Sequence, residues 1–75
     1  MKQQTYYTVY NKKTNSYMDF SVFNQTVWKK DLTPSCLCDN VQRAYREVDI
    51  LTSQRICKDD ELEVKPITIE VDNEN

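Results

Sequence analysis

The three cysteines are the side chains in this sequence with the widest range of possible chemistry. Cys36 and Cys38 form a C-x-C pair, and Cys57 lies far along the chain. Zinc takes four ligands, usually Cys or His in C-x-x-C spacing. The chain has no histidine, so a fourth ligand would be a carboxylate such as Asp39 or come from another chain. C-x-C also differs from the redox spacing C-x-x-C. We therefore predict buried reduced thiols, with no metal and no cofactor.

Enzyme chemistry lacks its usual residues as well. Without histidine there is no typical proton carrier near neutral pH, and no base to activate Ser35 or Ser53. The carboxylates of Asp59–Glu61 lie in a polar stretch that offers no pocket to shift their pKa. The chain also has no glycine, which excludes phosphate-binding loops of the P-loop and dinucleotide types. We predict no catalytic residues.

Aromatic residues are the strongest remaining signal, because they make up 11% of this chain. Strand alternation places Tyr6 and Tyr10 opposite Tyr7 and Val9, and leaves Tyr17 on an uncovered face beside the tryptophan. Tyrosine and tryptophan give rigid contact area with a polar tip, so they dominate binding hot spots. The candidate partner-binding residues are these aromatics and the lysines around them: Tyr6, Tyr10, Tyr17, Trp28, Lys12, Lys13, Lys29 and Lys30.

Two other roles for the same aromatic residues stay open. The tyrosines could form cross-strand pairs that only stabilise a hairpin, or they could stack single-stranded nucleic acid between the lysines. The net charge of −2, from 10 basic and 12 acidic residues, argues against nucleic acid. Protein binding is therefore the first hypothesis and nucleic-acid binding the second.

The first half of the chain predicts a β-hairpin. Thr5–Asn11 is rich in Tyr, Thr and Val, which favour strands. The polar stretch Asn11–Ser16 predicts the turn, with asparagine at the positions that tolerate a left-handed backbone. Tyr17–Phe23 is the second predicted strand. Three of its residues are expected to face the core: Met18, Phe20 and Val22.

A helix is predicted over Val41–Ser53, and its start has two interpretations. In the first, Thr33 caps a helix that begins at Pro34. In the second, Cys36–Cys38 is a short strand and Asp39 or Asn40 caps a helix that begins near Val41. In the first interpretation, the apolar stripe of the helix consists of Leu37, Val41, Ala44, Tyr45, Val48 and Leu51.

The last element is a strand over Glu61–Asp72, in which Pro66 shifts the alternation between two apolar halves. Proline predicts a bulge, a break or an edge strand there. The acidic segment 72–75 is expected to be frayed. The predicted core is Val9, Phe20, Val22, Val41, Ala44, Val48, Leu51, Ile67 and Ile69. The fold expected is α+β, in the order β-β-(β)-α-β, with three or four antiparallel strands and one helix on one face.

With 75 residues, the chain predicts a single domain over 1–75. So small a core often recruits a second copy of the chain, so a homodimer is considered. No apolar run is long enough for a bilayer and no secretory segment is present. We expect a cytoplasmic protein with no membrane partner.

The pattern Y-x-V-x-N-K-x-T-x-x-Y over Tyr7–Tyr17, followed by Trp28 and Asp31, then Asp39 and Ala44, resembles small uncharacterised proteins of bacteriophages and other mobile elements. The resemblance covers most of the chain, although its motifs are loose and the glycine common in such hairpins is missing. It implies an early accessory protein that binds a host protein, such as a defence nuclease or the replication or transcription machinery. It carries over no functional residues.

Overall fold

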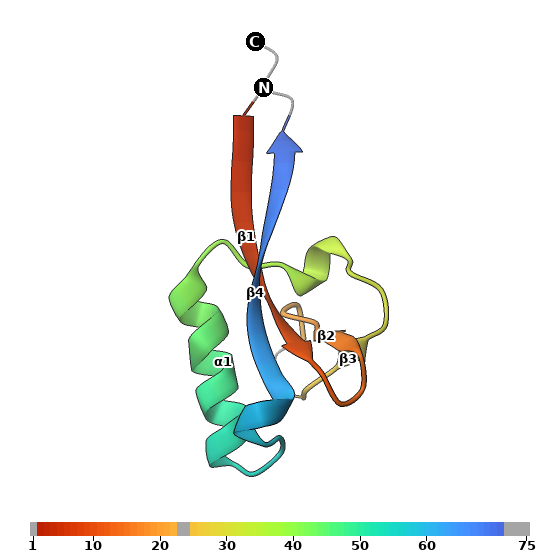
Figure 1. The fold of residues 1–75 in the computed structure, drawn as a ribbon, viewed down its shortest axis with the longest axis vertical. Coiled ribbons are helices and arrows are strands. Elements are labelled where there is room, and N and C mark those ends of the chain that lie inside the picture. The colour runs from red at the N-terminus through yellow and green to blue at the C-terminus, as the bar shows by residue number, and fades with distance from the viewer. Residues whose placement is uncertain (1, 23–24, 72–75) are drawn as a thin grey trace.

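The computed structural model describes residues 2–22 and 25–71 (Figure 1). Over these residues the chain forms a four-stranded antiparallel sheet, in the order β3-β2-β1-β4, and one α-helix. The elements are β1 (Lys2–Asn11), β2 (Ser16–Met18), β3 (Trp28–Lys29), the 3-10 turn η1 (Pro34–Cys36), α1 (Val41–Ser53), the 3-10 turn η2 (Asp59–Glu61) and β4 (Leu62–Val71). The predicted α+β fold is confirmed. The predicted frayed segment 72–75 lies outside the described residues.

A long two-stranded ribbon of β1 and β4 is the spine of the molecule. The two strands pair antiparallel over their whole length, from Lys2 opposite Val71 to Asn11 opposite Leu62, with no bulge. Pro66 therefore lies in an edge strand, one of its three predicted positions, and the alternation continues through it. Because the side chains alternate without interruption, Leu62 and Ile67 point to opposite faces.

The hairpin turn between β1 and β2 is confirmed. The Asn11 Oδ1 atom accepts hydrogen bonds from the backbone N–H groups of Lys13 and Thr14, at 3.0 and 3.3 Å. Asn15 has φ 52°, the left-handed conformation expected of an asparagine in this turn. The side chain of Asn11 is thus buried and bonded rather than solvated.

The second strand is shorter than predicted. β2 ends at Met18 instead of continuing to residue 23. The N–H of Asp19 still donates to the Val27 carbonyl at 2.9 Å, in line with the β2–β3 pairing. The N–H of Phe20, however, donates to the Ser35 carbonyl at 2.8 Å, so the backbone leaves the strand there. Phe20 is still buried, as predicted, while Val22 is only half-buried. Phe23 lies outside the described residues.

The helix begins at Val41, in agreement with the second interpretation of its start. The side chain of Asn40 accepts a hydrogen bond from the N–H of Gln42 at 2.9 Å and so caps the helix. Pro34 begins only the short turn η1, and Cys38 forms an isolated antiparallel bridge with Tyr7. The segment between η1 and α1 is therefore attached directly to β1.

The core lies between α1 and one face of the ribbon. Its buried residues are Val9, Met18, Phe20, Cys38, Ala44, Leu51, Cys57 and Leu62, and Tyr7, Trp28, Val48 and Val64 pack against them half-buried. Four predicted core or stripe positions are wrong, and Val41 is only half-buried. Tyr45 is 56% exposed on the outer helix surface, and Ile67 and Ile69 lie on the face opposite Leu62, where Ile69 is 37% exposed. Leu37 precedes the helix.

Candidate protein-contact face

A pair of tyrosines lies on the sheet face opposite the main core. Tyr10 and Tyr17 are directly opposite each other on β1 and β2, with ring centroids 5.2 Å apart and planes tilted by 51°. The hydroxyl of Tyr10 donates to the Asn15 Oδ1 atom at 2.8 Å. Such cross-strand aromatic pairs stabilise a hairpin and hold both rings in place. The two rings are therefore held rigidly and half-buried, and their exposed parts are available for contact with a partner.

Two lysines complete this patch. The Nζ atom of Lys65, on β4, lies 4.1 Å from the Tyr10 ring centroid, a cation–π contact. Lys29, on β3, is opposite Tyr17 and on the same face. We call Tyr10, Tyr17, Lys29 and Lys65 together the tyrosine face. Lys65 was not predicted, although the uninterrupted alternation of β4 places it on the same face as Ile67.

The third predicted tyrosine belongs to a different surface. Tyr6 is on the same side of β1 as Tyr10, but Thr8 between them is completely buried. The segment that follows η1 reaches β1 here, since the Tyr7 N–H donates to the Cys38 carbonyl at 2.8 Å. Tyr6 instead lines an open hollow of about 420 Å³ together with Pro34, Leu37, Cys38, Asp39, Arg43 and Ile69. The structure thus separates Tyr6 from the tyrosine face.

Trp28 does not join the tyrosines, so its predicted place beside them is wrong. It is opposite Met18 in the β2–β3 pairing and packs against the core on the helix side of the sheet. Neighbouring residues of a strand point to opposite faces, so Lys29 reaches the tyrosine face and Trp28 cannot. Trp28 is therefore half-buried against the core, on the face opposite the tyrosines.

The remaining predicted lysines surround the hairpin turn without forming one patch. Lys12 and Lys13 are exposed in the turn, and Lys13 Nζ lies 3.7 Å from the Glu61 Oε2 atom. Lys30 Nζ donates to the Thr14 carbonyl at 2.5 Å. Lys13 therefore contacts the residue that precedes β4, whereas Lys30 contacts the hairpin turn itself.

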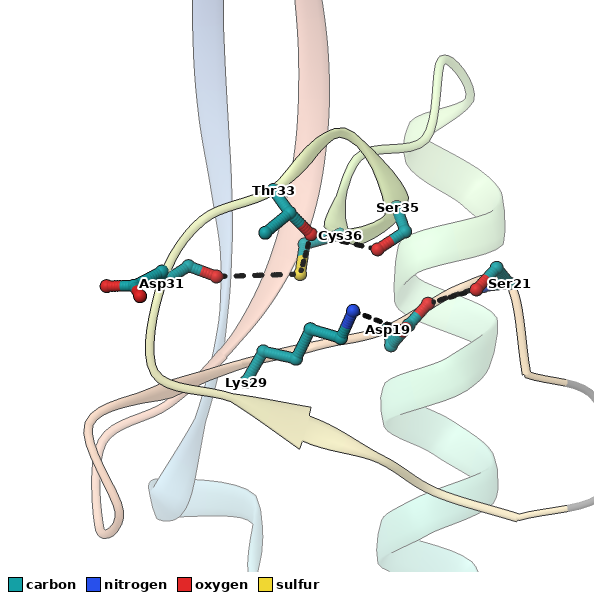
Figure 2. Close-up of polar contacts among 7 residues, drawn as sticks. All are labelled: Asp19, Ser21, Lys29, Asp31, Thr33, Ser35 and Cys36. Atoms are coloured by element: carbon teal, nitrogen blue, oxygen red, sulfur yellow. Dashed lines mark hydrogen bonds and ion pairs between the residues drawn. The ribbon is translucent and has the colours of Figure 1, made fainter.

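A polar cluster fixes the loop behind the tyrosine face (Figure 2). Asp19 Oδ1 accepts hydrogen bonds from the Ser21 N–H at 2.8 Å and the Ser21 hydroxyl at 2.6 Å, and Lys29 Nζ lies 3.2 Å from Oδ2. The hydrogen bonds from Ser21, with the ammonium of Lys29, lower the pKa of Asp19 to about 2. A carboxylate with so low a pKa stays ionised near neutral pH, so its role is to hold Lys29 and the hairpin.

The second half of this cluster closes η1 onto the sheet. The hydroxyls of Thr33 and Ser35 share a hydrogen bond of 2.8 Å, and the Cys36 Sγ atom lies 3.4 Å from the Thr33 Oγ1 atom (Figure 2). Sγ also lies 4.0 Å from the Asp31 carbonyl. Cys36 is completely buried among these groups. Its thiol therefore packs and bonds inside the loop.

All three cysteines are free and buried. Burial raises the pKa of the Cys38 and Cys57 thiols above their ordinary value of 9.0. A thiol with a raised pKa carries little thiolate near neutral pH and is a weak nucleophile. Among residues 2–22 and 25–71, no three Cys, Asp or Glu side chains come together as a metal site would require.

Comparison with known proteins gives no relative from which a role could be transferred. No protein-family model, curated protein or solved structure matches the chain significantly. In the described part of the chain, no helix has the length and apolar character needed to cross a membrane.

Proposed function

We propose that this chain is a non-enzymatic protein-binding module that uses the tyrosine face as its contact surface. The observation that carries the proposal is the rigid cluster in which Lys65 and Tyr17 hold Tyr10 in place on an open sheet face. Tyrosine rings fixed before binding lose little side-chain entropy on contact, and their hydroxyls bond to polar groups of a partner. Such clusters are typical of binding hot spots.

The proposed role is that of a phage-type inhibitor in the cytoplasm of a bacterial host. Its partner would be a host protein of defence, replication or transcription, and its mechanism would be steric occlusion of that protein's working surface. The face carries charges of both signs, because exposed Glu63 is opposite Tyr10 and Lys29 is paired with Asp19. It therefore favours a partner surface of mixed charge. The resemblance to small mobile-element proteins supports the proposed role.

Nucleic acid is the less favoured partner. Base stacking needs an open aromatic face, but the ammonium of Lys65 already lies over the ring of Tyr10 at 4.1 Å. A base would have to displace that lysine before it could stack. The net charge of −2 also gives no overall attraction for phosphate.

The proposal is tested by affinity capture from bacterial lysate with two tyrosine variants. Tyr17→Ala removes half of the ring pair, whereas Tyr45→Ala removes an exposed ring from the far side of α1. We expect a single stoichiometric host protein that survives nuclease treatment, is retained by Tyr45→Ala and is weakened at least about tenfold by Tyr17→Ala. Circular dichroism establishes that both variants are folded.

Two results would contradict the proposal. Equal capture by folded Tyr17→Ala and Tyr45→Ala would remove the tyrosine face from the interaction. Capture that disappears with nuclease, together with a steep loss of oligonucleotide binding as salt rises, would favour the nucleic-acid alternative.

A further inference from the structure

The outer half of the β1–β4 ribbon projects from the body as an arm, which we define as residues 2–6 and 67–71 (Figure 1). It accounts for much of the elongation of the molecule, whose extents are 47 × 23 × 23 Å. Every residue from Lys2 to Thr5 is exposed. An isolated two-stranded ribbon is only marginally stable in water, and a third strand or a packed face normally supports it.

The arm carries its apolar residues on one face. That face holds Tyr6, Ile67 and Ile69 together with Lys2 and Gln4, and Ile69 is 37% exposed. Tyr6 and Ile69 also line the hollow described above. The other face carries only polar residues: Gln3, Thr5, Thr68 and Glu70. Apolar residues exposed on a projecting ribbon favour a surface that is covered by a partner.

The two edges of the arm differ in their capacity to pair. Tyr7 directs its N–H and carbonyl to Cys38, away from β4, so its opposite residue Pro66 directs its own backbone away from β1. The missing N–H of Pro66 therefore falls on the outer edge of β4 at the base of the arm, and limits pairing along that edge to Thr68 and Glu70. By the same alternation, Gln3 and Thr5 direct their N–H and carbonyl groups to the outer edge of β1. That edge has no strand partner among the described residues beyond the bridge at Tyr7.

We propose that two copies of this chain pair through the β1 edges of their arms. We consider the antiparallel register in which Gln3 lies opposite the partner's Thr5. In this register the outward N–H and carbonyl groups of Gln3 and Thr5 in each copy form hydrogen bonds with the other copy. The pairing makes four backbone hydrogen bonds and joins the two arms into one four-stranded sheet, β4-β1-β1-β4. The twofold axis passes between the two Gln4 residues.

The side chains and charges fit a second copy. In this register Lys2 lies beside the partner's Tyr6, a cation–aromatic pair, and no two like charges are opposed. Tyr6, Ile67 and Ile69 of both copies then lie on one face of the four-stranded sheet, together with Lys2 and Gln4 of both copies. Pairing through β4 would instead bring the acidic Glu70 residues of both copies onto adjacent strands, next to a residue, Pro66, that has no N–H to donate. Because so short a pairing buries less area than a standard interface, we expect a weak, concentration-dependent dimer.

The first test is sedimentation equilibrium with a matched pair of proline variants. Thr5 and Thr68 are the same residue type, are opposite each other, and share one hydroxyl contact of 3.4 Å. Proline at either position removes an outward N–H and spares the β1–β4 ladder. Only Thr5→Pro alters the proposed pairing edge.

We expect the wild-type mass to rise from 8.9 kDa towards twice that value between about 1 μM and about 1 mM protein. Thr68→Pro should behave like wild type, whereas Thr5→Pro should weaken the dimer at least about tenfold. A monomer at every concentration, a Thr5→Pro protein that dimerises like wild type, or equal losses in both variants would each overturn the proposal.

The second test is disulfide crosslinking between two copies of the chain. It does not depend on Thr5→Pro, so it remains informative if that variant does not fold. The proposed register brings the Cα atoms of the two Gln4 residues to about 4.5 Å, within the range that a disulfide spans. Oxidised Gln4→Cys should therefore form a covalent dimer, while Thr68→Cys, on the β4 edge, should not. Failure of Gln4→Cys to crosslink, or equal crosslinking of both variants, would overturn the register. Both tests use the isolated chain, so their outcome is independent of the proposed host partner.

Discussion

Asp19 shows that a buried carboxylate in this protein has a structural role. Its low pKa comes from the hydrogen bonds of Ser21 and the ammonium of Lys29, which favour the ionised form. The side chain links the end of β2 to β3 and orients Lys29 toward the tyrosine face. Its protonation should therefore loosen the hairpin that carries half of the proposed contact surface.

The first prediction concerns acid stability. The pKa of Asp19 is about 2 in the folded protein and 3.8 in its ordinary state. Asp19 thus contributes stability above pH 3.8 that is lost as the pH falls toward 2. We expect wild type to lose its stability advantage over Asp19→Asn in this window, as measured by urea unfolding at a series of pH values. Asp60→Asn, at an exposed position, is the control and should keep the wild-type dependence. A constant difference between wild type and Asp19→Asn from pH 5 to pH 2 would contradict this account.

The second prediction concerns Thr8, whose hydroxyl is completely buried and has no partner among the described residues. Valine has nearly the same shape and suits a strand, so Thr8→Val removes an unsatisfied polar group without a cavity. We expect a gain of about 1 kcal/mol in the free energy of unfolding, measured by urea denaturation. The exposed Thr5→Val serves as the control. A loss of stability in Thr8→Val would mean that the hydroxyl has a bonding partner, such as a buried water molecule.

At the scale of elements, the start of α1 depends on one side chain. The Asn40 side chain bonds the Gln42 N–H at 2.9 Å, which satisfies one of the unpaired donors of the first turn. Asn40→Ala should reduce the free energy of unfolding by about 1 kcal/mol, because alanine supplies no acceptor. Asn40→Ser restores an acceptor and should recover most of this loss. Thermal unfolding followed by circular dichroism measures both, and equal stability of Asn40→Ala and wild type would contradict the cap.

The sequence could predict those elements whose residue types and alternation are sufficient to define them. Strand alternation correctly placed Tyr6 and Tyr10 opposite Tyr7 and Val9, and the asparagines correctly indicated the hairpin turn. The end of β2 could not be predicted in this way. It is set by the hydrogen bond from Phe20 to Ser35, which belongs to another segment further along the chain. The sequence could not decide among a bulge, a break and an edge strand at Pro66. The missing N–H of proline disrupts a sheet only if it faces a neighbouring strand, and here the direction it faces follows from the pairing of Tyr7 with Cys38.

At the scale of the whole molecule, the candidate site was only partly predictable. Tyr10, Tyr17 and Lys29 do share one face, whereas Tyr6 is separated by buried Thr8 and Trp28 belongs to the core. The first difference arises because the segment after η1 reaches the ribbon beside Thr8. The second arises because the short β3 pairs in a register that opposes Trp28 to Met18. The positions of Tyr6 and Trp28 therefore depend on tertiary contacts, which cannot be predicted from the local sequence pattern.

Pro66 has a consequence for how far self-association could extend. A sheet with two open edges can add strands at both sides, so it can grow into a fibre without limit. Here Pro66 interrupts the outer edge of β4 at its centre, and the proposed pairing uses the β1 edge of each arm. In the described part of the chain, Thr68 and Glu70 still direct their N–H and carbonyl groups to the outer edge of β4, so any growth past two subunits would have to use a pairing that stops short of Pro66. The same proline that interrupts the apolar alternation of the sequence would thus shorten the edge through which an exposed, β-rich arm could polymerise.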